Sequence, residues 1–501
     1  MVKFSFRKVS NYFVSLILLL LGCISILGAM GTLSKSIEEV TYRYIYILDA
    51  LLLIIIFMYL LRGKCKEILK KYGKMVFLAS IFCIILWQIW MVVTLVSVTR
   101  WDPTTVLYEV MGHPLWNKEY FSVYPNNFFI VAFERALWLL FGKPDLFSFT
   151  RILGFLNILV VDSTILFTRS IIKRYYKEFI ANSFTFFCVS LLGLSPWITI
   201  PYSDIWSFCI SSCNLSILIL LFNKNKHEKK LRYVLLGIMG ALAAISYFLK
   251  PSLVIFYVAL VIVLSCKHIS AKEYLKFNLI GTFVVMFMLV FAGISFYKNN
   301  NSFLKTDSSK AFSLVHFAAM GITNKGGYSR EISAKDQSIN SPEERKKHDI
   351  KVIKKRLNEL GIAGYQRYLL GKQMRNTSDG TFAWGSEATI RLLKQKRSAV
   401  RTSLPRRIYT EKNIATKKSN FLVSVQIIWI MCLFFMLCSF YNEKWVVQVL
   451  KYTVVGFCLF LLLFEGGRSR YIIQFLPFII MLTSIGMENI VKNGSKSTGI
   501  D

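Results

Sequence analysis

The stretch Met75–Thr99, MVFLASIFCIILWQIWMVVTLVSVT, contains no charged residue and is followed at once by Arg100–Pro103, RWDP. A helix needs about 20 consecutive apolar residues to cross a bilayer, so this stretch predicts a membrane span. Asp102 then stands just past the end of that span. Because a carboxylate at a membrane boundary is costly when it loses its hydration, its position indicates a possible functional role.

The composition of the whole chain supports this interpretation. Of the 501 residues 54% are hydrophobic, and the formal net charge is +33. These values exclude an ordinary soluble enzyme and a disordered tail. Apolar stretches recur almost to the C-terminus with basic clusters between them, which predicts an all-α, multi-pass protein of the cell membrane. Tyr12–Leu33 lacks a convincing cleavage site and is interpreted as a span.

Basic clusters between the apolar stretches set the predicted topology, because they are enriched in cytoplasmic loops. The clusters are Lys3–Lys8, Arg62–Lys74, Arg169–Lys177, Asn223–Arg232 and Lys267–Lys276. Placing all of them inside predicts about 12 spans with both termini in the cytoplasm. The spans are approximately 12–33, 43–61, 75–98, 149–168, 178–199, 205–222, 233–249, 252–266, 277–297, 419–441, 446–463 and 471–490.

One further apolar segment, Tyr124–Gly142, does not fit as a span. It carries Glu134 and Arg135 at its centre, and counting it as a crossing would put Arg169–Lys177 outside. We interpret it as a helix that lies at the outer face. A true crossing with an internal ion pair is the alternative.

The topology divides the chain into three parts. Residues 1–297 form a membrane domain with a first outer loop, 99–148, that would be catalytic. Residues 298–418 form a mixed extracytoplasmic segment with 26 lysines and arginines against 10 acidic residues, and 419–501 form the C-terminal membrane helices. Long outer loops escape the positive-inside bias, so this basic segment does not contradict the orientation. Its portion Lys351–Met374 has the spacing of a helix that lies against the membrane surface.

Acids and cations gather on the predicted outer side. Asp102 and Asp204 stand at the outer ends of different spans, where they could act as general base and supporting acid, cap a helix, or hold a divalent cation. Lys250, Arg468 and Arg470 emerge on the same side and suit a lipid-linked phosphate. A single cation of this kind is more often explained by snorkelling, but three opposite two acids indicate an anionic substrate.

Other outer residues are weaker candidates for contact with substrate. Tyr124, Asn126 and Asn127 offer groups for sugar hydroxyls, although helix capping alone would explain the amides. His316 and Glu387 could contact a sugar or a phosphate, or be purely structural. No nucleotide-binding glycine motif, nucleophile elbow or Cys/His zinc spacing is present, so no required cofactor and no nucleic-acid partner is expected.

Several short motifs in chain order resemble the GT-C class of polyprenol-phosphate-dependent glycosyltransferases, in particular the bacterial group similar to protein mannosyltransferases. The motifs are WDP (Trp101–Pro103), YFSVYPNN (Tyr120–Asn127), PYSD (Pro201–Asp204), FLKPS (Phe248–Ser252), HFAAMG with GGY (His316–Tyr328), DGTFAWGSE (Asp379–Glu387) and GRSRYIIQFLP (Gly467–Pro477). The resemblance covers residues 75–490. Relatives tend to have an acidic residue and alanine where this chain has Gly466-Gly467.

The resemblance implies an inverting glycosyl transfer at the extracytoplasmic face. Asp102 would be the base, Asp204 a supporting acid, and Lys250, Arg468 and Arg470 the phosphate ligands. The donor would be a polyprenyl-phosphate-linked sugar and the acceptor a cell-envelope glycan, teichoic acid or similar polymer. A transporter or flippase of lipid-linked saccharide is the main alternative, and a scaffold that docks on anionic wall polymers is a third.

Overall fold

The computed structural model describes residues 6–39, 62–99, 101–223, 229–271, 277–386, 390–393, 400, 402–416 and 420–497. The predicted span at 43–61 lies outside the described residues. The longer helices are α1 (Phe6–Glu39), α3 (Arg62–Thr94), α7 (Leu146–Tyr175), α8 (Glu178–Cys188), α9 (Ser203–Asn223), α10 (Lys229–Leu249), α11 (Ile255–Ala271), α12 (Phe277–Asn300), α15 (Pro342–Thr377), α18 (Asn420–Leu437), α19 (Trp445–Leu463) and α20 (Leu476–Ser497).

The predicted fold class, an all-α polytopic membrane protein, is confirmed. In the described part of the chain eight helices are long and apolar enough to cross a membrane. Apart from a few end residues, these helices contain eight of the predicted spans, namely 12–33, 75–98, 149–168, 205–222, 233–249, 277–297, 446–463 and 471–490. The predicted spans at 178–199, 252–266 and 419–441 correspond to shorter apolar helices, Glu178–Gly193, Pro251–Lys267 and Val423–Leu437.

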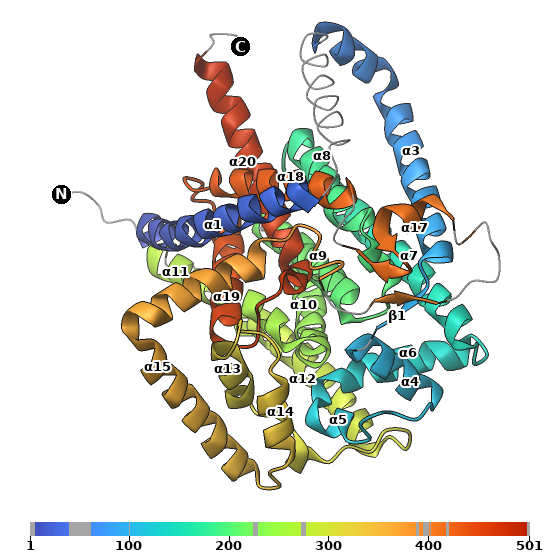
Figure 1. Cartoon of the computed structure of the whole chain (residues 1–501). Coiled ribbons are helices and arrows are strands. Elements are labelled where there is room, and N and C mark those ends of the chain that lie inside the picture. Colours follow the sequence, from blue (N-terminus) through green and yellow to red (C-terminus); the bar gives the residue numbers. More distant parts are fainter. Residues whose placement is uncertain are drawn as a thin grey trace.

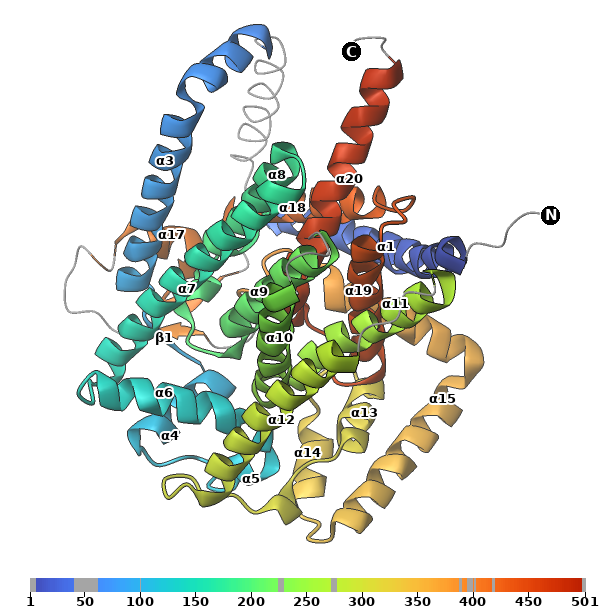
Figure 2. The ribbon, with the colours of Figure 1, turned by 180° about the vertical axis from the view of Figure 1, so that it is seen from behind.

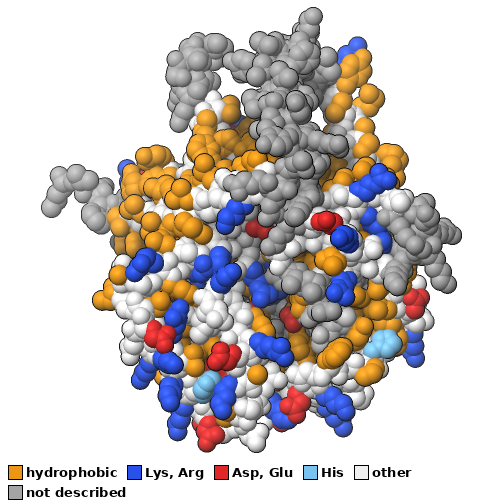
Figure 3. All heavy atoms as spheres, in the orientation of Figure 1, with side chains coloured by type: hydrophobic (Ala, Val, Ile, Leu, Met, Phe, Trp, Pro, Cys, Tyr) orange, Lys and Arg blue, Asp and Glu red, His pale blue; other side chains and the backbone are white. Residues whose placement is uncertain are grey.

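The helices of the first outer loop and the helices at 314–377 of the outer segment lie at one end of the molecule. Figures 1 and 2 show α4 (Asp102–Met111), α5 (Tyr120–Val123), α6 (Phe128–Leu140), α13 (Leu314–Ile322), α14 (Arg330–Gln337) and α15 at the lower end, away from the C-terminal end of α20. In Figure 3 hydrophobic side chains gather over the upper part of the surface, and most charged side chains lie over the lower part. This distribution is that of a membrane-embedded body with a polar cap.

The segment at 124–142 forms helix α6 of 13 residues. At about 1.5 Å per residue this helix is too short to cross a hydrocarbon core of about 30 Å. Arg135 donates to the carbonyl of Val110 at 3.1 Å, and Glu134 is buried with only 1% exposure. The helix therefore packs on α4 as part of the polar cap, and no ion pair between its two central charges is needed.

Short strands tie the first outer loop to the far end of the outer segment. β1 (Ser97–Val98) pairs antiparallel with β2 (Arg391–Leu392), and β2 pairs with β4 (Ile414–Ala415), which pairs with β3 (Thr410–Glu411). The short helix α17 (Leu404–Tyr409) precedes β3. As predicted, the outer segment is mixed rather than purely helical, and one of its strands adjoins the chain that leads to Asp102.

Serine caps start the helices of the outer segment. Ser313, Ser329 and Ser341 precede α13, α14 and α15, and each side chain accepts a hydrogen bond from a backbone N–H of the first turn. Such caps satisfy donors that have no partner inside a helix. α15 is kinked at Gly361, whose φ of 58° and ψ of −177° interrupt the helix. The helical prediction for Lys351–Met374 is correct except at this kink.

A buried lysine anchors α15 to the membrane helices. Lys372 is fully buried, and its ammonium group donates to the carbonyls of Gly321 at 2.5 Å, Leu462 at 3.1 Å and Phe464 at 2.7 Å. Burial lowers the pKa of Lys372 to about 7, and the nearby Arg375 acts in the same direction. Three carbonyls match the three donors of an ammonium group, so the contact joins α13, α15 and the end of α19.

We expect Lys372→Met to lower the thermal midpoint of the purified protein in detergent. The substitution would leave three buried carbonyls without this donor, at a cost on the order of 2–4 kcal/mol. Lys351→Met on the exposed side of the same helix is the matched control and should leave the midpoint unchanged. Equal midpoints for both variants would contradict an anchoring role.

The topology predicts that Lys305 is extracytoplasmic and Arg174 cytoplasmic, and both side chains are exposed. A membrane-impermeant maleimide should label Lys305→Cys on intact cells but Arg174→Cys only after permeabilisation, with the unsubstituted chain as the blank. Labelling in the reverse order would invert the orientation derived from the basic clusters.

Candidate functional site

A cavity of about 890 Å³ opens where the polar cap meets the membrane helices. Its wall contains residues of the first outer loop, the start of η5 (Pro251–Val254), the outer segment and the loop before η7 (Ser469–Phe475). The predicted site residues that line it are Asp102, Tyr124, Asn126, Asn127, Lys250, Arg468 and Arg470. Groups that are up to 368 positions apart in the sequence therefore face one space.

Asp102 begins α4 and is held by two tyrosine hydroxyls. Tyr120 donates to its Oδ1 at 2.6 Å, and Tyr202 donates to its Oδ2 at 3.0 Å. Asn127 completes the network, because its Nδ2 donates to the Tyr120 hydroxyl at 2.8 Å and its Oδ1 lies 3.2 Å from the Tyr202 hydroxyl. Burial, and next the neighbouring Asp102, raise the pKa of Tyr120 well above its usual value. Tyr120 therefore remains a donor that orients the carboxylate.

Asp204 lies behind the cavity wall with 3% exposure. Its carboxylate accepts a hydrogen bond from the Lys250 ammonium, and its Oδ2 lies 3.9 Å from Arg470 Nε. The Arg470 guanidinium also lies 3.8 Å above the Trp101 ring. Asp204 thus faces two of the cavity's cations, and its place suits a residue that positions them better than one that touches substrate.

The loop that carries Arg468 packs closely against the outer segment, and Asn376 Oδ1 of that segment accepts a hydrogen bond from Gly467 N at 2.5 Å. Gly466 N donates to Gly326 O at 2.7 Å, and a Cβ at Gly467 would lie 2.8 Å from the carbonyl of Lys325. Gly467 also has a φ of +73°, which favours glycine. The Gly466-Gly467 pair that departs from the resembled family is therefore used for close approach to Gly326-Gly327.

Glu465 lines the same cavity beside these glycines. Burial raises the pKa of Glu465 above its usual value, although the adjacent Arg468 acts in the opposite direction. Tyr471 donates to its Oε1 at 3.4 Å. A proton on this carboxyl would leave the nearby cations less compensated.

The predicted site residues Tyr124, Asn126 and Asn127 belong to the turn that leads into α6. Pro125–Asn127 form the 3-10 helix η2, directly before α6. The Tyr124 ring lies 5.2 Å from that of Tyr120 and 5.4 Å from that of Phe312, and burial raises the pKa of its hydroxyl. Asn127 holds the tyrosines of Asp102, whereas Asn126 is exposed at the cavity wall.

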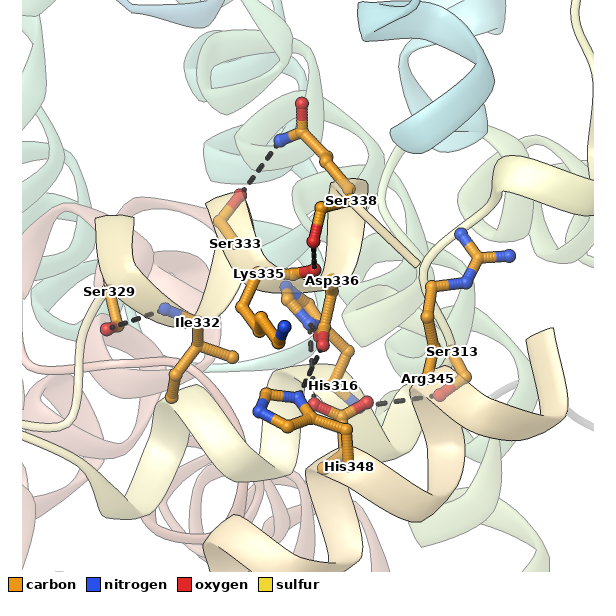
Figure 4. Close-up of polar contacts among 12 residues, drawn as sticks. Ser313, His316, Ser329, Ile332, Ser333, Lys335, Asp336, Ser338, Arg345 and His348 are labelled. Carbon is orange, nitrogen blue, oxygen red and sulfur yellow. Dashed lines mark hydrogen bonds and ion pairs between the residues drawn. The ribbon is translucent and has the colours of Figure 1, made fainter. Parts of the chain in front are cut away.

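His316 is not among the residues that line the cavity. It is buried behind Phe312, with the two rings stacked 3.7 Å apart, and its Nδ1 contacts the Asp336 carboxylate. Figure 4 shows His316, Asp336 and His348 converging from three short segments of helix. Burial would lower the pKa of His316, but Asp336 and Asp349 outweigh it and hold the pKa above its usual value. Glu387 lies outside the described residues.

Sequence reasoning missed several residues of the wall. Tyr120 and Tyr202 stand within the YFSVYPNN and PYSD motifs but were not predicted as site residues. The available signal was that each shares a motif with a predicted site residue, Asn127 or Asp204. Glu465 and Gln474, which accepts a hydrogen bond from Ser252 at 2.6 Å, were not predicted either, and no local sequence pattern marked them.

Comparisons with known proteins add a family and no activity. A search of curated proteins and a search of solved structures found no match to this chain. A family model described as "conserved hypothetical integral membrane protein" matches residues 3–491. Since the match spans nearly the whole chain, the protein belongs to this family of integral membrane proteins.

Proposed function

We propose that the protein is a glycosyltransferase of the GT-C type. It transfers a sugar from a polyprenyl-phosphate-linked donor to an extracytoplasmic acceptor, such as a cell-envelope glycan or teichoic acid, by an inverting single displacement. The observation that carries the proposal is the convergence of Asp102, Lys250, Arg468 and Arg470 on one cavity of about 890 Å³. A cavity of this size suits a sugar phosphate together with an acceptor.

The surroundings of Asp102 support its role as the base. The hydroxyls of Tyr120 and Tyr202 fix the orientation of the carboxylate, and each oxygen keeps a further lone pair for an acceptor. Positioning of this kind matters because a carboxylate is a weak base. As the acceptor oxygen bonds to the anomeric carbon, its proton passes to Asp102 and the carbon–phosphate oxygen bond breaks.

The charges of the site support a phosphate leaving group. Lys250, Arg468 and Arg470 contribute three positive charges, and ionised Asp102 and Asp204 contribute two negative ones. With Glu465 neutral, the site then carries one positive charge opposite the single negative charge of a phosphodiester donor. When Asp102 takes the proton, the site gains one positive charge as the departing phosphate gains a negative one. Stabilisation that grows during the reaction lowers the barrier.

Transport of a lipid-linked saccharide is the competing activity, since the same cations would hold a lipid phosphate. A transporter has no use for a base that faces an acceptor. The tyrosine-held carboxylate beside the cations therefore favours transfer over transport, and the two activities differ in their dependence on Asp102.

Asp102→Asn should abolish transfer while leaving the protein inserted in the membrane. Loss of a general base reduces the rate by about 10²–10⁴-fold. The measurement is the envelope sugar that disappears on gene deletion, quantified after complementation with the wild-type or the variant chain. Glu119→Gln, an exposed acid of the same outer loop, is the matched control and should restore the sugar fully. Full restoration by Asp102→Asn would remove the proposed base and favour transport.

Donor binding should weaken as the pH rises through the raised pKa of Glu465. A protonated Glu465 leaves the cations free to hold phosphate, whereas an ionised one competes for them. We expect Glu465→Gln to keep tight binding across the pH series, read from the fluorescence change when a polyprenyl phosphate is added to the purified protein. An equal pH slope in the two proteins would assign the dependence to another group.

A further inference from the structure

We propose that the outer segment holds a second site, a binding site for a divalent transition-metal ion formed by His316, Asp336 and Asp349. The site is separate from the cavity described above and does not depend on the proposed glycosyl transfer. The ion would suit a structural role, since the cluster joins three helices and none of its members is among the residues that line the cavity.

The ligand atoms come from three different helices. His316 lies in the first turn of α13, Asp336 near the end of α14 and Asp349 near the start of α15. One atom of each, the imidazole nitrogen and one carboxylate oxygen from each acid, lies within 4.8 Å of the other two. All three side chains are at least 99% buried. These separations bring the three side chains within reach of one ion, which would replace the direct contact between His316 Nδ1 and the Asp336 carboxylate.

The cluster contains two buried polar atoms that have no hydrogen-bond partner within the described part of the chain. These atoms are Asp349 Oδ1 and His316 Nε2. Asp349 Oδ1 lies 3.6 Å from His316 Nδ1, beyond hydrogen-bond distance. Buried carboxylate oxygens almost always have a partner, so this oxygen requires one. A bound cation would supply it.

Charge balance is consistent with a bound ion. Two buried carboxylates lie beside His316, and when both are ionised, one imidazolium leaves that triad with a net negative charge. A divalent ion with a neutral imidazole neutralises both carboxylates. Buried charges are retained in proteins when they are paired or coordinate a metal.

The donor set indicates the class of metal. Imidazole nitrogen suits zinc and the later transition metals, whereas carboxylate oxygen suits manganese, calcium and magnesium. One nitrogen and two oxygens therefore point to Zn²⁺ or Mn²⁺. His348 Nδ1 lies 2.7 Å from Asp336 Oδ1, where it orients that carboxylate. Such partners of metal ligands tune the affinity of the site.

The position of the cluster explains what an ion would do. It would hold α13, α14 and α15 together at one point, behind the cavity wall. Phe312, which stacks on His316, and Gln337, the neighbour of Asp336, both line the cavity. Gln337 also accepts a hydrogen bond from Asn117 of the first outer loop at 3.2 Å. The ion would thus stabilise the outer-segment side of the cavity without touching a substrate.

The test measures metal directly on the full-length protein, purified in detergent through a tag without histidine. We expect ~1 ion of Zn²⁺ or Mn²⁺ per chain by elemental analysis after dialysis. Chelation should lower the thermal midpoint, and ZnCl₂ or MnCl₂ alone should restore it. Asp349→Asn and His316→Gln should lose both the ion and the response. His348→Gln should bind the metal about 10–100-fold more weakly.

His113→Gln is the matched control, because His113 is an exposed histidine of the first outer loop. It should keep the ion and the response to chelation. The proposal would be overturned if the wild-type protein carried substoichiometric metal and its thermal midpoint did not respond to either salt. The cluster would then be stabilised by protonation instead of by an ion. Unchanged metal content in both Asp349→Asn and His316→Gln would overturn it too, since the ion would lie elsewhere. Neither measurement requires glycosyl transfer, so failure of the proposed activity would not affect it.

Discussion

The cationic wall of the cavity depends on the buried carboxylate of Asp204. Lys250 and Arg470 come from the ends of different apolar helices, and both lie against this one acid. A cation taken out of water without a counter-charge is strongly destabilised, and so is a lone carboxylate. The start of α9, the junction of α10 with η5, and η7 therefore have to meet at the same depth. This packing sets where the cavity lies.

Trp101 connects the cationic wall to the carboxylate of Asp102. Its ring lies 3.8 Å below the Arg470 guanidinium and packs edge-on against Tyr202, at 5.8 Å between ring centroids. Tyr202 in turn donates to Asp102. The separation of the acid from the cations is therefore determined by aromatic packing, which resists small displacements better than exposed ion pairs do. The contacts of the Trp101 ring with both Arg470 and Tyr202 explain why a tryptophan directly precedes Asp102.

The sequence was sufficient to predict the all-α membrane fold and eight helices long enough to cross a membrane in the described part of the chain, because an apolar run is a local property. The helix at 128–140 could be separated from the spans for the same reason. Contacts made between distant segments were not predictable in this way. The tyrosines that hold Asp102, the two-residue strands, and the burial of His316 behind Phe312 all depend on packing. Of the two roles considered for His316, its place behind the cavity wall agrees with the structural one.

The glycine pairs at 326–327 and 466–467 have a structural consequence. They meet through a backbone hydrogen bond, and a Cβ at Gly466 or Gly467 would collide with neighbouring main-chain or side-chain atoms. Because the backbones meet directly and Asn376 fills the remaining space beside Gly466, a side chain at either glycine of the second pair would push the two segments apart. The close contact of the two glycine pairs thus fixes the position of the arginine-bearing loop against the outer segment, whatever side chains the surface of α13–α15 carries.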